Sequence, residues 1–131
     1  MLSYLHTMIR VLDLNKSIHF YTEGLGFELL SKTDYPEGRF TIAFLKSKSD
    51  EGPSAPKLEL TYNWDTRDYQ KGENYGHMAY RVESIDVVRE LLKSKGYDLS
   101  WGPGLTPNGK TKMAFVDDPD GFEIEFLEFR G

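Results

Sequence analysis

The sequence predicts an α+β fold built from two tandem βαβββ modules. The chain repeats itself: HTMIRVLDL from His6 is answered by HMAYRVESI from His77, at an offset of 71 residues. In each half, an alternating segment is followed by a helical period and then by three more alternating segments. With 131 residues the chain is long enough for one domain, but each half is too short to build a large core alone. We therefore expect one domain, 1–131, with modules at about 1–68 and 74–131.

The first module begins with an expected strand over residues 5–11. Its alternation puts His6, Met8 and Arg10 on one face. Asp13 is a suitable N-cap for the helix that follows. The apolar stripe of this helix, spaced by four, three and four residues, comprises Leu14, Ile18, Tyr21 and Leu25. Strands are then expected at about 27–33, 40–45 and 57–62, with a polar loop at 46–56 and the join between modules at 63–74.

The second module repeats this order. A strand is expected at about 75–82, then a helix capped by Ser84 whose apolar stripe is Ile85, Val88 and Leu92. Short strands follow near 98–101, 111–116 and 123–127. The segment DDPDG at 117–121 predicts a turn, and the glycine- and proline-rich segment GPGLTPNG at 102–109 predicts a loop that could serve as a mobile lid.

The composition restricts the classes of function. Hydrophobic residues make up 39% and charged residues 28%, which is typical of a soluble globular protein. A net charge of −5 without any basic stripe argues against nucleic acid as a partner. The absence of a long apolar run argues against a membrane span or signal peptide, so a cytoplasmic location is expected. Because the chain has no cysteine, any metal must be held by nitrogen and oxygen ligands.

Two histidines and two glutamates recur at matching positions of the repeat. His6 and His77 lie in the first strand of each module, and Glu59 and Glu125 lie in the last. Taken singly, each glutamate is a common solvated residue of an amphipathic strand, and each histidine is more often structural than a ligand. Their recurrence in register instead favours two half-sites of one metal centre. His19 has no counterpart in the second module, and we interpret it as a surface or packing residue.

Such a ligand set indicates a particular chemistry. Two imidazoles and two carboxylates suit a borderline divalent cation such as nickel, cobalt, zinc, manganese or iron. Four protein ligands on an octahedral ion leave two positions for a chelating substrate, which suits Lewis-acid chemistry next to a carbonyl. A carboxylate beside that substrate could also serve as a general base.

At these residues the sequence resembles the vicinal oxygen chelate superfamily, and within it the glyoxalase I (lactoylglutathione lyase) family of the short bacterial type. The matching stretches are LHTMIRVLDLNKSIHFYTEGLGFELL, AFL, LELTYNW, YGHMAYRV and AFVDDPDGFEIEFLE. They cover both modules. The combination of LHTMIRV with LELTYNW is specific, whereas DPDG followed by a strand glutamate is shared more widely in the superfamily.

The resemblance implies a fold, a metal site and a reaction. It implies mainly antiparallel sheets that form a metal-binding cleft, with one divalent metal on His6, Glu59, His77 and Glu125 at the interface of a homodimer. The implied activity isomerises the methylglyoxal–glutathione hemithioacetal to S-D-lactoylglutathione through a metal-bound enediolate, with Glu125 as the principal base and Glu59 on the opposite face. Histidine as the first ligand resembles the nickel- or cobalt-activated class, so Ni²⁺ is the first choice, with Co²⁺, Mn²⁺ and Zn²⁺ as alternatives.

The resemblance also implies how glutathione binds. Residues matching Arg10 and Asn63 contact the γ-glutamyl end, and an arginine fork on a carboxylate is a sound physical reason for this. A rim salt bridge is an equally good interpretation of Arg10. Lys110 resembles a lysine that holds the glycyl carboxylate in longer members. Another basic position of the eukaryotic form falls on Glu73, and this departure leaves the identity of the thiol open.

Other functions share parts of this pattern. Fosfomycin-modifying thiol transferases use two histidines and one glutamate, so the presence of Glu59 as well as Glu125 argues against them. Extradiol dioxygenases also use two histidines and one carboxylate, but usually in longer chains with more modules. Methylmalonyl-CoA epimerase uses a very similar metal set and is the alternative enzyme, although LELTYNW and Arg10 favour glyoxalase. The alternative outside catalysis is a metal-free small-molecule-binding resistance protein, and the presence of all four candidate ligands argues against it.

Overall fold

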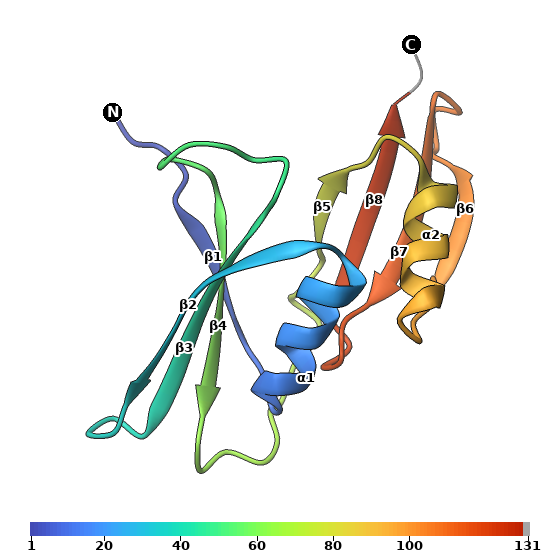
Figure 1. The fold of residues 1–131 in the computed structure, drawn as a ribbon. Helices are drawn as coiled ribbons and strands as arrows, with labels where there is room; N and C mark the ends of the chain where they lie inside the picture. Colours follow the sequence, from blue (N-terminus) through green and yellow to red (C-terminus); the bar gives the residue numbers. More distant parts are fainter. Residues whose placement is uncertain (130–131) are drawn as a thin grey trace. The chain divides into compact units, whose positions relative to one another are not determined.

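The computed structural model describes residues 1–129; the last two residues of the expected domain lie outside this range. Contacts divide the chain into two compact units, Met1–Tyr69 and Gln70–Gly131. Each unit has a four-stranded mixed sheet and a helical segment in the order βαβββ, so the predicted α+β class and its duplicated module are confirmed (Figure 1). The helices within residues 1–129 are all too short or too polar to span a bilayer.

The first unit contains four strands in the sheet order β1-β4-β3-β2. Its elements are β1 (His6–Arg10), α1 (Leu14–His19), η1 (Phe20–Gly24), β2 (Phe27–Tyr35), β3 (Phe40–Ser47) and β4 (Lys57–Asn63). β1 and β4 are parallel, whereas β2–β3 and β3–β4 are antiparallel. The first and last strands of the module are therefore neighbours, although about fifty residues separate them in sequence.

The helix of the first unit differs from the predicted stripe. α1 ends at His19, and a π-helical turn, η1, replaces the rest of the expected α-helix. In η1 the amide of Leu25 donates to the carbonyl of Phe20 at 3.0 Å, five residues back. Of the predicted stripe, Leu14 and Tyr21 are buried, whereas Ile18 and Leu25 are only half-buried. Ser17 and Phe20 are buried as well. The predicted N-cap is confirmed, because the Asp13 carboxylate accepts from the Lys16 amide at 3.1 Å.

The core of this unit follows from strand alternation. Ala43, Leu45, Leu58 and Leu60 are at most 3% exposed. The intervening residues of β3 and β4 lie on the opposite face of the sheet, and Glu59 is one of them. The same pattern that builds the core therefore turns this glutamate to the other face.

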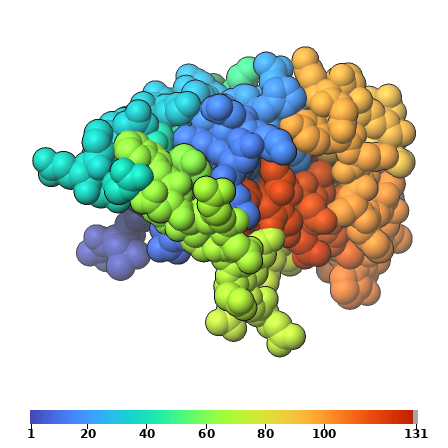
Figure 2. Space-filling view, turned by 90° about the horizontal axis from the view of Figure 1, so that it is seen from below, coloured from blue at the N-terminus to red at the C-terminus, as the bar shows by residue number. Residues whose placement is uncertain are grey.

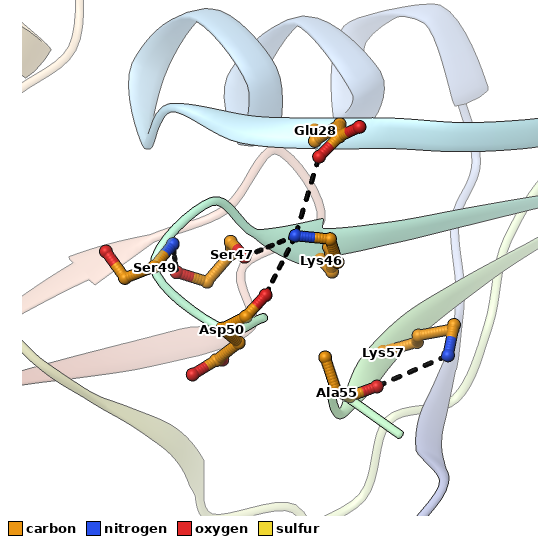
Figure 3. Close-up of polar contacts among 7 residues, drawn as sticks. All are labelled: Glu28, Lys46, Ser47, Ser49, Asp50, Ala55 and Lys57. Atoms are coloured by element: carbon orange, nitrogen blue, oxygen red, sulfur yellow. Dashed lines mark hydrogen bonds and ion pairs between the residues drawn. The ribbon is translucent and has the colours of Figure 1, made fainter. Parts of the chain in front are cut away.

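The loop between β3 and β4 is tied to the sheet by a lysine (Figure 3). The ammonium of Lys46 contacts the backbone oxygens of Asp50 at 2.8 Å and Ser47 at 3.3 Å, and the Glu28 carboxylate on β2 at 3.5 Å. Where the loop enters β4, the ammonium of Lys57 donates to the Ala55 carbonyl at 3.3 Å. These contacts fix the start of the strand that carries Glu59.

The far end of the β2–β3 hairpin is the most exposed part of the first unit. Every residue from 28 to 39 is exposed, and the cyan tip of the hairpin projects from the unit in Figures 1 and 2. β2 is an edge strand of its sheet, which agrees with this exposure.

The second unit repeats the topology with sheet order β5-β8-β7-β6. Its elements are β5 (His77–Arg81), α2 (Ile85–Ser94), β6 (Trp101–Leu105), β7 (Thr111–Asp117) and β8 (Glu123–Phe129). β5 and β8 are parallel, and the other pairs are antiparallel. Its core consists of Ile85, Leu92, Ala114, Val116, Ile124 and Phe126. The DPDG turn is confirmed: the Asp118 carboxylate accepts from the amides of Asp120 and Phe122, each at 2.9 Å.

The strand expected at 98–101 was placed too early. β6 runs instead from Trp101 to Leu105 and includes the first half of the segment expected to be a loop. Pro103 cannot donate to a ladder, but β6 is an edge strand, where proline is tolerated. The pairing with β7 shifts register between Trp101 and Gly104, so the irregularity falls beside this proline. Only 106–110 remains as the connection to β7.

Candidate metal and substrate site

In the first unit, parallel strands bring His6 and Glu59 together. His6 pairs in register with Lys57, and Met8 pairs with Glu59. The side chains of His6 and Glu59 therefore lie on the same sheet face, two residues apart along the strands. His6 Nε2 lies 2.9 Å from Glu59 Oε1. The imidazole edge also contacts the ring of Phe44, with 5.5 Å between ring centroids. This packing sets the plane of the imidazole.

The second unit repeats the arrangement with His77 and Glu125. His77 pairs with Glu123, and Ala79 pairs with Glu125, on parallel strands β5 and β8. His77 Nε2 lies 3.4 Å from Glu125 Oε1. Phe115 takes the place of Phe44, with 5.4 Å between its ring and that of His77. The repeat seen in the sequence is thus reproduced at the level of side-chain geometry.

The two glutamate side chains are less exposed than the two histidine side chains. The Glu59 and Glu125 side chains are only 13% and 14% exposed, whereas those of His6 and His77 are 32% and 41% exposed. The interpretation of the glutamates as solvated residues is therefore wrong. A carboxylate held away from water needs a positive or polar partner, and here the nearest one is the histidine.

Each pair supplies one imidazole nitrogen and one carboxylate oxygen, which are suitable donors for a borderline divalent cation. Within residues 1–129, no group of three or more histidine, aspartate or glutamate side chains is placed to hold a metal. One unit alone therefore offers two ligands, which is half of the four that the sequence predicts. The donor chemistry fits such an ion, provided that the two pairs act together.

Arg10 and Asn63 lie on the same sheet face as Glu59. Arg10 is exposed and pairs in register with Thr61, two residues before Asn63. The amide Nδ2 of Asn63 donates to the Tyr69 hydroxyl at 2.9 Å. Arg10 is therefore available to a ligand, and the orientation of the Asn63 amide is set by a tyrosine that the sequence did not indicate.

The chain after Asn63 is fixed by an arginine and a tryptophan. Trp64 Nε1 donates to the buried Thr41 hydroxyl at 2.8 Å, and the Trp64 amide donates to the Arg39 carbonyl at 3.0 Å. The Arg39 guanidinium lies 5.6 Å from the Trp64 ring and donates to Asp65 at 2.5 and 2.8 Å. Hydrogen bonding from Arg39 lowers the pKa of the Asp65 carboxyl. The end of β4, with Asn63, is held in place from the β2–β3 hairpin.

Lys110 lies in the connection that precedes β7, with an exposed side chain. Its backbone amide donates to Asn108 Oδ1 at 3.0 Å, and the Thr106 hydroxyl donates to the same oxygen at 2.7 Å. These bonds fix the turn and leave the ammonium at the surface.

A cavity in the second unit was not foreseen. It measures about 450 Å³ and is lined by Ser100, Trp101, Met113, Phe115, Asp117 and Glu123. Phe115 belongs both to this cavity and to the packing around His77. Trp101 contacts the same Phe115 ring, with 6.1 Å between centroids. Alternation in 111–117 predicts that Met113, Phe115 and Asp117 lie on one face of the sheet. It could not predict that Trp101 lines the same cavity, because β6 begins later than expected.

Comparison with known proteins agrees with this architecture. The family model of the Glyoxalase/Bleomycin resistance protein/Dioxygenase superfamily matches residues 3–126. The chain belongs to this superfamily. A curated relative from Neisseria meningitidis serogroup A, named lactoylglutathione lyase, is 48% identical over 95% of this chain and 88% of its own length.

Solved structures give the same result. Glyoxalase I from Zea mays superposes with a TM-score of 0.87 at 37% identity, over 98% of this chain and 45% of the maize chain, so this chain spans about half of the maize protein. The trypanothione-dependent glyoxalase I of Leishmania major gives a TM-score of 0.80 at 42% identity, over 98% of this chain and 87% of that one. The resemblance to the glyoxalase I family, an enzyme family of lactoylglutathione lyases, is therefore confirmed.

Proposed function

We propose that this protein is a metal-dependent lactoylglutathione lyase that isomerises the hemithioacetal of methylglyoxal and glutathione to S-D-lactoylglutathione. The observation that carries the proposal is the pair of repeat-related His–Glu contacts, at 2.9 Å in one unit and 3.4 Å in the other. The relatives named lactoylglutathione lyase support the choice of reaction. The role of such an enzyme would be methylglyoxal detoxification.

In this proposal, His6, Glu59, His77 and Glu125 together hold one divalent metal. The ion supplies Lewis-acid stabilisation of negative charge on the substrate oxygens. Ni²⁺ is our first choice, because histidine as the first ligand resembles the nickel- or cobalt-activated class. Two imidazoles and two carboxylates would also suit Co²⁺, Mn²⁺ or Zn²⁺. Since each unit offers only two ligands, we propose that the four meet at the interface of a homodimer.

The glutamates then move the proton. Glu125 removes it from C1 of the hemithioacetal and returns it to C2, with an enediolate between the two steps, and Glu59 serves the opposite face. Low exposure suits this role, because less water competes with a bound substrate for the carboxylate oxygens. The Phe44 and Phe115 rings limit the rotation of the two histidines.

Three polar residues would bind the thiol. Arg10 would pair with the γ-glutamyl carboxylate, and Asn63, oriented by Tyr69, would hydrogen-bond the same end. Lys110 would pair with the glycyl carboxylate. The whole chain, 1–131, would act as one glyoxalase domain, and a cytoplasmic location stays a prediction.

The experiment that tests this proposal is an absorbance assay for thioester formation. The metal-free protein is reconstituted with Ni²⁺ or Zn²⁺ and supplied with methylglyoxal and either glutathione or a different low-molecular-weight thiol. We expect isomerisation with glutathione that depends on metal and is faster with Ni²⁺. Absence of thioester with every metal would reject the lyase. Epimerisation of methylmalonyl-CoA by the same samples would favour the alternative enzyme.

A further inference from the structure

We infer that Arg81 is a carboxylate-binding residue of the substrate site and helps to select a thiol with a second carboxylate. This inference rests on the proposed function. It begins from the repeat, because Arg81 follows His77 by the same four positions by which Arg10 follows His6. In register, Arg10 pairs with Thr61, two residues beyond Glu59, and Arg81 pairs with Leu127, two residues beyond Glu125. Each arginine thus shares a sheet face with the His–Glu pair of its own unit.

The surroundings of Arg81 hold its guanidinium in place. The guanidinium lies 4.6 Å from the centre of the Phe129 ring, and both residues are exposed. Phe129 follows Glu125 by four positions, as Asn63 follows Glu59, so the ring occupies the place of Asn63 in the other module. A guanidinium stacked on a ring keeps its N–H edge free, which is the edge that binds a carboxylate in a fork.

A second cation lies at the same end of this sheet. Phe129 pairs with Thr111 at the start of β7, and Lys110 directly precedes that residue. β5 and β7 flank β8, so Arg81 and Lys110 approach the end of β8 from its two sides. This end of the second unit therefore suits an anion.

The distance between each arginine and the histidine of its own sheet suits a tripeptide thiol. Four residues of a strand separate each arginine from its histidine, which corresponds to about 13 Å along the sheet. An ion held by both His–Glu pairs would have one arginine at this spacing on each of the two sheets. A thiol whose sulfur-bearing residue lies beside the His77–Glu125 pair could place a terminal carboxylate on Arg81. The ligand chemistry is thus a dicarboxylate thiol, with Arg10 for one end and Arg81 for the other.

The test compares two thiols that differ at one carboxylate. Wild-type enzyme and Arg81→Met are assayed with the hemithioacetals of glutathione and of its glycine ethyl ester. Methionine keeps much of the contact with Phe129 but cannot bind an anion. We expect Arg81→Met to raise KM for the glutathione substrate about tenfold, because a charge-assisted hydrogen-bond pair is lost. The turnover number should change little, and the ester should be used equally by both proteins.

Controls separate this inference from the proposed function. Arg67→Met, at an exposed arginine near the end of the first unit, should leave the KM for both substrates unchanged. If Arg81→Met raises KM equally for both hemithioacetals, or raises it for neither, the inference is wrong. Calorimetric binding of an S-alkyl glutathione and its glycine ester to both proteins gives a readout independent of turnover. A wild-type preference for the free acid that Arg81→Met abolishes would support the inference even in a protein without lyase activity.

Discussion

Glu125 shows how the proposed role of one residue depends on its position. Strand alternation between Ile124 and Phe126 predicts that it faces away from the core, and the structure confirms this. Sequence could not predict that the side chain is 14% exposed beside His77, because that depends on the parallel pairing of β5 with β8. Parallel pairing joins segments that are far apart in sequence, and no local pattern reports it.

We expect Glu125→Gln to lower turnover at least a hundredfold, because an amide cannot accept the proton, and general-base catalysis contributes about 10²–10⁴-fold. The amide is nearly the same size as the carboxylate, so thermal stability should be retained. Turnover is measured by thioester absorbance with the metal content determined in the same sample. Glu83→Gln, at an exposed residue after β5, is the matched control. Wild-type turnover by the Glu125 variant would refute the assignment of the base.

A buried hydroxyl network also operates at the scale of single residues. Thr41 is 4% exposed, accepts from Trp64 Nε1 at 2.8 Å and donates to Asp34 at 2.7 Å. We expect Thr41→Val to destabilise the protein by about 1–3 kcal/mol, because the indole N–H loses its acceptor. Denaturant unfolding measures the change. Thr33→Val, at an exposed threonine of β2, is the comparison, and an equal effect of both substitutions would contradict the importance of the network.

At the scale of elements, the sequence was most informative where capping and periodicity agree. Ser84, Ile85 and Leu92 defined the start and the buried face of α2, and the structure has both. It was least informative where geometry departs from regular repeats. The π-helical turn η1 replaces the end of the predicted α-helix, and β6 has a register shift beside Pro103. Both irregularities depend on packing within a unit rather than on the local residue pattern.

The cap of α2 gives a prediction at this scale. The Ser84 hydroxyl accepts from the Val87 amide at 3.3 Å, so Ser84→Ala leaves a helix N–H without that partner. We expect a loss of about 1 kcal/mol in the free energy of unfolding. Ser94→Ala, at the other end of α2, removes a hydroxyl that only donates to the Leu91 carbonyl and should cost less. If both variants lower the free energy of unfolding equally, the N-cap bond contributes no more than the bond from Ser94.

An ion pair between α2 and the following segment predicts a pH dependence. Arg89 Nε lies 3.0 Å from Asp98, and hydrogen bonding from Arg89 lowers the pKa of the Asp98 carboxyl. A lowered pKa stabilises the fold above the carboxyl's ordinary pKa, and this stability is lost as the pH falls through the folded-state value. We expect Asp98→Asn to melt below wild type at neutral pH. The difference should shrink between about pH 5 and pH 3. A difference that stays constant over this range would contradict the ion pair's contribution.

At the scale of the whole molecule, the repeat is the feature from which most of the function could be predicted. It identified the four candidate ligands, and the structure brings them together two by two. Sequence spacing could not predict whether the two pairs share one ion, because in the proposed function that depends on assembly rather than on either unit. The two units differ at one matching position, with Asn63 in one and Phe129 in the other, so the proposed substrate site is asymmetric although the fold is repeated.

The central claim, that His6 and Glu59 of one subunit share a metal with His77 and Glu125 of another, is tested by mixing two inactive proteins. One carries His6→Ala and Glu59→Ala, the other His77→Ala and Glu125→Ala. After random exchange of subunits, half of the dimers are mixed, and each has one intact site of two. Lyase activity should therefore recover to about a quarter of wild type. A mixture that remains as inactive as its components, although mass spectrometry shows mixed dimers, would contradict the shared site.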